Sequence, residues 1–118
     1  MFPKVAETLT KQGFEIQKLS ETENPVYAFK FSENGHPLIC FSKKYDDDFN
    51  PVSDFAAIMT CSSADQGCPF IPGAEKRIAV KFEDPKISDG SPGMDETYFN
   101  RSFEIASEMY FVFSKIRK

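Results

Sequence analysis

The stretch "FAAIMTCSSADQGCPFIPGAEKRIAVKF", residues 55–82, contains two apolar runs separated by a polar segment with glycine and proline. The first run, "FAAIMTC" at 55–61, is continuously apolar and has the length of a buried strand, and "RIAVKF" at 77–82 is a second such run. Continuously apolar strands are typical of sheets that are covered on both faces. The stretch therefore predicts two buried strands of an α/β protein.

The residues before this stretch predict a helix, a strand and a hairpin. Residues 2–12, "FPKVAETLTKQ", have the apolar spacing of a short helix, and residues 14–19, "FEIQKL", alternate as a half-buried strand does. Two aromatic runs within 24–42 flank Asn34-Gly35, the pair that best tolerates positive φ at both centres of a type I′ turn. Because Pro37 has no N–H for a ladder, the second hairpin strand is expected at an edge.

The C-terminal residues 95–118 predict a long helix. Its apolar residues recur at spacings of four and three, which places them on one face packed against a sheet, with Asp95 as the N-cap. This face consists of Phe99, Phe103, Ala106, Tyr110 and Phe113. No repeat, low-complexity tract or linker interrupts the order of elements, so we expect a single α/β domain over residues 1–118.

Composition limits the classes of function. The chain has 118 residues, of which 41% are apolar and 14% aromatic, so it can bury a core. A net charge of -4 argues against a nucleic acid or an anionic membrane as partner, because both need a basic patch. No apolar run reaches membrane-spanning length, and the N-terminus lacks the layout of a signal peptide. We therefore expect a cytoplasmic protein whose partners are proteins or small molecules.

The three cysteines leave several interpretations open. An odd number without a secretion signal disfavours a disulfide framework, and a zinc site needs closer ligand pairs than Cys61, Cys68 and the distant His36 provide. We expect no metal and no cofactor. Cys61 and Cys68 reach disulfide distance only if the loop between them folds back, and the residues alone favour two ordinary thiols. Cys40 is interpreted as a packed apolar thiol.

The acidic sequence "YDDDFNP" at residues 45–51 interrupts the strand pattern. Its carboxylates lack the spacing of a calcium-binding loop. We interpret this segment as a solvated loop and assign it no site.

In its order of strand, "CSSADQGCPF", second strand, "FEDP" and long helix, the chain resembles the low-molecular-weight protein tyrosine phosphatase superfamily, especially its thioredoxin-coupled arsenate reductases. Those enzymes are similar in having a strand that ends in Cys, a second Cys after six residues, a following Pro, and an Asp-Pro after the next strand. The resemblance implies a three-layer, phosphotyrosine-phosphatase-I-like (flavodoxin-like) fold with a largely parallel sheet, to which a hairpin is added here. The matching residues are Cys61, Cys68, Pro69, Asp84 and Pro85.

The resemblance also implies catalytic roles for three residues. In such enzymes the aspartate of Asp-Pro is a general acid for the leaving oxygen, which corresponds to Asp84. The two extra cysteines relay oxidation away from a nucleophilic cysteine and finish as a disulfide that thioredoxin reduces, which corresponds to Cys61 and Cys68.

The nucleophilic Cys-x5-Arg loop of that family has no match in this sequence. Counting six positions on from Cys40, Cys61 and Cys68 gives an aspartate, a glycine and an alanine. We therefore expect the C-terminal part of a longer family member, or a descendant without the nucleophilic half, that is inactive alone. The complete protein would then bind thioredoxin or a small oxyanion. A homodimer or the missing N-terminal half would cover the open sheet edges. The alternative is a non-catalytic α/β binding domain that keeps the scaffold.

Overall fold

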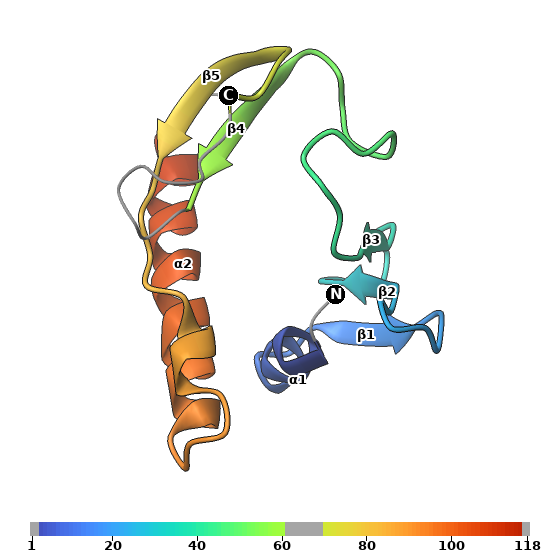
Figure 1. Ribbon diagram of the computed structural model, residues 1–118, viewed down its shortest axis with the longest axis vertical. Helices are drawn as coiled ribbons and strands as arrows, with labels where there is room; N and C mark the ends of the chain where they lie inside the picture. Colours follow the sequence, from blue (N-terminus) through green and yellow to red (C-terminus); the bar gives the residue numbers. More distant parts are fainter. Residues whose placement is uncertain (1–2, 61–69, 117–118) are drawn as a thin grey trace. The chain divides into compact units, whose positions relative to one another are not determined.

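The computed structural model describes residues 3–60 and 70–116, and its elements are those of a mixed α/β protein (Figure 1). The described residues form two compact units. The first combines the described parts of Met1–Ser42 and Ser88–Lys118, and the second is Lys43–Ile87. The α/β class that the sequence predicts is thus confirmed, whereas the three-layer arrangement and the single domain stay predictions.

The first unit contains an antiparallel sheet of three strands in the order β1-β2-β3. Ile16 pairs with Phe29 across β1 and β2, and Ala28 pairs with Ile39 across β2 and β3. The predicted strand and hairpin are therefore confirmed, and β3 lies at the edge that Pro37 predicts. The bounds are Glu15–Lys18 for β1, Tyr27–Lys30 for β2 and Leu38–Cys40 for β3.

The predicted type I′ turn is wrong. Among the described residues, Asn34 and Gly35 do not belong to those with positive φ. Strand β2 ends at Lys30 and β3 begins at Leu38, so the connection at residues 31–37 is wider than a two-residue turn. Its turn is closed by the Gly35 N–H, which donates to the Ser32 carbonyl at 3.2 Å. A loop of this width turns the chain without the left-handed backbone that a type I′ turn requires.

Helix α1 (Pro3–Lys11) covers this sheet and completes the core of the first unit. Proline suits its first turn, where the missing N–H would have no partner in the helix. Ala6 packs against Tyr27 and Phe29 of β2, and all three side chains are buried. Cys40 is partly buried against this cluster, so its interpretation as a packed apolar thiol is confirmed.

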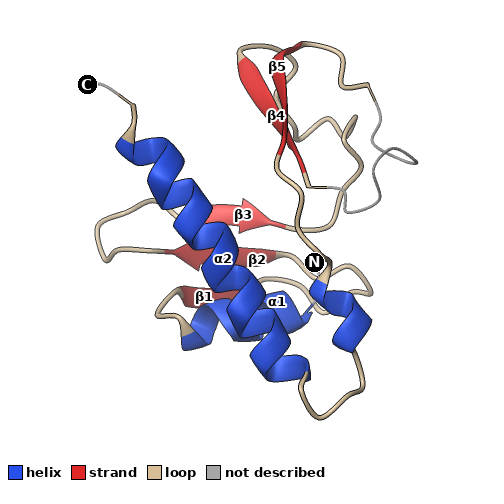
Figure 2. Ribbon diagram, turned by 90° about the vertical axis from the view of Figure 1, so that its left-hand side faces the viewer, coloured by secondary structure: helices blue, strands red, loops and turns tan. Residues whose placement is uncertain are grey.

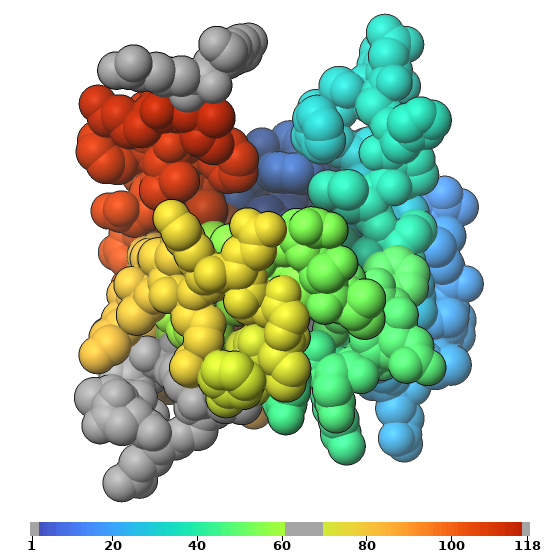
Figure 3. Space-filling model, turned by 90° about the horizontal axis from the view of Figure 1, so that it is seen from above, coloured from blue at the N-terminus to red at the C-terminus, as the bar shows by residue number. Residues whose placement is uncertain are grey.

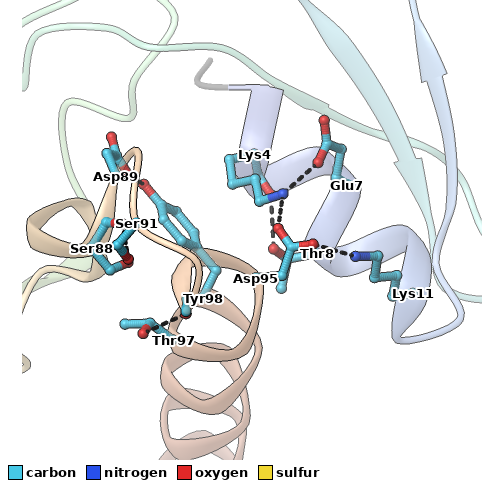
Figure 4. Close-up of polar contacts among 11 residues, drawn as sticks. Lys4, Glu7, Thr8, Lys11, Ser88, Asp89, Ser91, Asp95, Thr97 and Tyr98 are labelled. Atoms are coloured by element: carbon cyan, nitrogen blue, oxygen red, sulfur yellow. Dashed lines mark hydrogen bonds and ion pairs between the residues drawn. The ribbon is translucent and has the colours of Figure 1, made fainter.

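Helix α2 (Met94–Ser114) contacts α1, which lies between α2 and β1 in Figure 1. Gly93 is its N-cap, so the prediction that Asp95 caps the helix is wrong. The Asp95 carboxylate lies in the first turn and pairs instead with Lys4 and, at 3.5 Å, with Lys11 of α1 (Figure 4). An acidic side chain in the first turn still complements the helix dipole.

The face of α2 that packs within the first unit differs from the predicted one. Asp95, Tyr98 and Ser102 follow a spacing of three and four, and Ser102 Oγ donates to Gln12 Oε1 at 2.7 Å. The Tyr98 ring is buried and its hydroxyl donates to Asp89 Oδ1 at 2.8 Å. The predicted face lies one position further round the helix, and its residues Phe103, Tyr110 and Phe113 are 63%, 80% and 67% exposed.

Figure 2 shows α2 as the longest helix of the structure. No helix among the described residues combines the length and the apolar character needed to cross a membrane.

The second unit contains the parallel strands β4 (Phe55–Met59) and β5 (Ala74–Ala79). Both predicted strands are confirmed, but β4 ends before the predicted residue 61, and β5 begins and ends three residues earlier than the predicted 77–82. Burial on both faces is wrong, because Ile58 and Ile78 are each 45% exposed, and Figure 3 shows atoms of both strands at the surface. Within this unit's described residues, the one helical element is the start of the short 3₁₀ helix η1 (Pro85–Ser88), so the unit itself supplies no long helix to pack on the two strands.

The Asp95 ion pairs predict a pH-dependent contribution to stability. The hydrogen bond from Lys4, then the positive charges of Lys11 and Lys4, lower the pKa of Asp95 from its usual value. A carboxylate with a lowered folded-state pKa stabilises the fold above its unfolded-state pKa of about 4, and this contribution is lost as the pH falls through the folded-state pKa. Asp95→Asn should therefore lower the melting temperature at neutral pH, by an amount that shrinks towards about pH 2.

Glu21→Gln is the matched control, because it breaks the Lys18–Glu21 pair at 2.7 Å without touching the two helices. The interpretation is contradicted if Asp95→Asn has no larger effect than this control at neutral pH, or if its effect is the same at both ends of the pH range.

Candidate functional site

The carboxyl ends of β4 and β5 define one edge of the parallel sheet. Met59 pairs with Ala79, and the Val80 N–H extends the ladder by donating to the Met59 carbonyl at 3.0 Å. Because the strands are parallel, the segments that follow them, starting at Thr60 and Val80, leave from the same edge. In open α/β sheets this is the edge where ligands bind.

The two candidate relay cysteines cannot be placed at this edge by the structure. Cys61 and Cys68, with Pro69, lie outside the described residues, which resume at Phe70. Cys61 directly follows Thr60 in the sequence. Their roles stay predictions.

Asp84 is described, and it lies between β5 and η1 with an exposed side chain. Its Oδ1 accepts the Lys86 N–H at 3.0 Å, and its carbonyl accepts the Ile87 N–H at 3.3 Å. An Asp-Pro pair suits this place because the carboxylate caps the helical turn, and Pro85 occupies the first helical position, where no N–H is needed. Oδ1 is thus engaged in the loop, while Oδ2 has no hydrogen bond within the part of the chain that the structure describes.

The basic residues on β5 and just after it are exposed to solvent. Lys76 and Arg77 are exposed, as is Lys81 beyond the strand. The Arg77 guanidinium lies 5.7 Å from the centre of the Phe70 ring, a cation–π distance. Phe70 is the first described residue after 61–69, so this contact ties the start of the 70–73 segment to β5.

A cavity of about 460 Å³ lies in the second unit, at the opposite ends of the same two strands. It is lined by residues of the loop 45–52, by Phe55 at the start of β4 and by residues 71–73, which lead into β5. The sequence predicted a solvated loop here and no site. The loop is indeed exposed at most positions, but it forms one wall of a cavity.

Hydrogen bonds within the loop hold this wall in place. Asn50 Nδ2 donates to the carbonyls of Lys44 and Tyr45, both at 3.0 Å, and the Asn50 N–H donates to the Asp47 carbonyl at 2.9 Å. Asp47 Oδ1 accepts the Phe49 N–H, also at 2.9 Å. One asparagine thus satisfies two carbonyl groups that would otherwise need water.

Gly73 joins the two walls of the cavity. Its φ is +84°, and a Cβ at this position would lie 2.2 Å from the Val52 carbonyl oxygen. Only glycine therefore allows the backbone of residues 71–73 to approach the loop this closely.

The chain was compared with protein-family models, with curated proteins and with solved structures, and none of them matches it. Within residues 3–60 and 70–116, no three His, Cys, Asp or Glu side chains converge in a way that could hold a metal ion.

Substitution of Gly73 tests whether the close approach shapes the second unit. In Gly73→Ala the new methyl group is strained by the left-handed backbone and also clashes with the Val52 carbonyl. In Gly90→Ala, at φ +79° with open space around it, only the backbone strain applies. We expect Gly90→Ala to lower the unfolding free energy by about 1 kcal/mol, and Gly73→Ala by roughly 2 kcal/mol more.

Urea unfolding measures the difference, followed through the amide resonances of residues 45–59 and 70–80 for Gly73→Ala and through those of residues 88–114 for Gly90→Ala, because the two glycines lie in different units. Equal destabilisation by both would contradict the close approach of the loop to residues 71–73.

Proposed function

We propose that this chain supplies the redox relay and the general acid of a thioredoxin-coupled arsenate reductase, or of a similar low-molecular-weight tyrosine phosphatase-like enzyme. The nucleophilic Cys-x5-Arg loop, which this sequence lacks, would come from the rest of the complete protein. The observation that carries the proposal is the parallel pairing of β4 with β5. Cys61 follows one of these strands and Asp84 follows the other, so both segments leave from the edge where α/β proteins bind ligands.

The proposed relay balances the electrons of arsenate reduction. Arsenate becomes arsenite by taking up two electrons and two protons and releasing water. Two thiols supply both when they become one disulfide, and exchange with the dithiol of thioredoxin restores them. Cys61 and Cys68, separated by six residues, are the pair in this sequence that the relay would use.

Asp84 would protonate the leaving oxygen. A general acid must stay in position and must have an oxygen free to carry the proton. The Lys86 N–H holds Oδ1 of Asp84 at 3.0 Å, while Oδ2 makes no hydrogen bond among residues 3–60 and 70–116. The exposed position of the side chain is compatible with reaching a substrate held by another part of the protein.

The second candidate function is a non-catalytic interaction domain, and the surface of α2 favours it. Tyr110, Phe111 and Phe113 are exposed near the end of this helix. Exposed apolar residues gathered on one segment are common at protein interfaces. The two candidate functions differ in the redox behaviour expected of the thiols, because an interaction domain does not require a reversible Cys61–Cys68 disulfide.

Oxidation of the thiols separates the two candidates. Under mild oxidation with diamide, peptide mapping should recover a Cys61–Cys68 disulfide before any product of Cys40, which is partly buried against the core of the first unit. Reduced thioredoxin should reverse it, and thioredoxin lacking its resolving cysteine should be trapped on Cys61 or Cys68. Cys40→Ser is the matched control and should change neither result. A dominant crosslink to Cys40, or thiols that resist oxidation while the chain is folded, would overturn the relay.

Activity assays test whether the chain is inactive without a Cys-x5-Arg loop. The purified chain should neither hydrolyse p-nitrophenyl phosphate nor reduce arsenate with thioredoxin, because no cysteine of this sequence lies in a Cys-x5-Arg loop. Turnover that persists through purification and is lost in Cys61→Ser or Asp84→Asn would contradict this prediction.

A further inference from the structure

The cavity beside β4 combines an apolar floor with an acidic rim. Phe55 and Ile71 supply the floor, and Ile71 is only 9% exposed, whereas Val52 lines the cavity with a largely exposed side chain. Tyr45, Asp46, Asp47 and Asp48 line the cavity on the loop side. We propose that this cavity binds a small organic cation, an ammonium or guanidinium group attached to an apolar body. The proposal does not rest on the relay cysteines, because the cavity lies at the amino ends of β4 and β5.

The size and the construction of the cavity suit a small molecule. Ligand sites in proteins typically measure about 300–1,000 Å³ and are mostly apolar, with a few polar groups that orient the ligand. At about 460 Å³ this cavity lies inside that range. The Asn50 hydrogen bonds and the contact of Gly73 with Val52 fix both walls before any ligand arrives.

The loop does not need two of its three carboxylates for its own structure. Asp47 accepts the Phe49 N–H, but Asp46 and Asp48 make no hydrogen bond or ion pair within the part of the chain that is described. The flanking Lys43 lies over the Phe49 ring, 5.5 Å from its centre. A concave surface with apolar walls and charges of one sign concentrates the potential in the cavity, which attracts a cation.

The geometry favours an organic cation over a bare metal ion. A hard metal ion needs several oxygens that converge on one point, and no three acidic side chains among residues 3–60 and 70–116 do so. An ammonium group tolerates dispersed carboxylates, and it also gains from the faces of aromatic rings such as those of Tyr45 and Phe55. The apolar body of the ligand would then cover the floor.

Two matched probes test the proposal on the full chain. Phenethylamine and phenylethanol have the same apolar body, and only the first is charged at neutral pH. Titrations followed by ¹H–¹⁵N spectra should show phenethylamine shifting the amides of residues 45–55 and 71–73 with a Kd of about 1 mM. Phenylethanol should bind at least about threefold more weakly, since one opposite charge at contact distance in water is worth that factor or more.

Variants on the rim supply the second test. Asp46→Asn and Asp48→Asn should each weaken phenethylamine binding by about three- to tenfold at low salt. Glu75→Gln is the matched control, because Glu75 is exposed on β5 in the same unit, does not line the cavity and carries the same charge. This control should bind phenethylamine as the unaltered chain does. Because the probe comparison needs only the unaltered chain, the proposal stays testable if a variant fails to fold.

Four results would overturn the proposal. The first two are the absence of shifts in residues 45–55 and 71–73, and binding of phenylethanol as tight as that of phenethylamine. The other two are a Glu75→Gln variant that weakens phenethylamine binding as much as the aspartate variants do, and displacement of phenethylamine by calcium at concentrations below the Kd of phenethylamine. A blocked lysine, Nα-acetyl-lysine amide, distinguishes the source of the cation. Weaker binding than phenethylamine indicates a free small molecule, and tighter binding indicates the same chemistry presented by a peptide side chain.

Discussion

The parallel pairing of β4 with β5 is the constraint on which both proposed sites depend. Because the two strands run in the same direction, the chain must return from the carboxyl end of β4 to the amino end of β5. This return brings residues 71–73 against Val52 and forms the cavity at the amino ends. The segments that carry Cys61 and Asp84 leave from the carboxyl ends. Strands of this length separate the two edges by about 15 Å, so the sites are distinct.

Among residues 43–60 and 70–87, the sheet of the second unit consists of these two strands. Isolated two-stranded sheets are only marginally stable in water. β5 is exposed at five of its six positions, and β4 alternates between half-buried and exposed ones. β5 carries Glu75, Lys76 and Arg77, and such charges oppose pairing with a further strand. β4, with the sequence FAAIM, carries no charge, so extension of the sheet is favoured along β4. In an enzyme assembled from this chain and a Cys-x5-Arg portion, that portion would supply hydrogen-bond partners for the backbone groups along the edge of β4.

Local patterns predicted the elements well, whereas their packing needed information from distant residues. The alternation in 14–19 and the apolar run at 55–61 identified β1 and β4, because each pattern reports directly on the strand. The packed face of α2 depended on Lys4 and Lys11 of α1 and on Gln12 in the turn after it, so the spacing of α2 alone was misleading. The cavity escaped prediction because its walls, at 45–52 and 71–73, meet only in the fold. Motif order indicated Asp84 but could not reveal that Lys86 holds its carboxylate.

Oxidation of Cys61 and Cys68 in the Cys40→Ser chain tests whether the segments after β4 and β5 form one redox-active edge. The ¹H–¹⁵N spectrum is recorded with these two thiols reduced and again with them oxidised. If the edge is shared, oxidation shifts the amides of Thr60 and Val80 and also those of Asp84 and residues 86–87, while β1 and β2 stay unchanged. Shifts confined to the immediate neighbours of the cysteines, with Val80 and Asp84 unmoved, would contradict it.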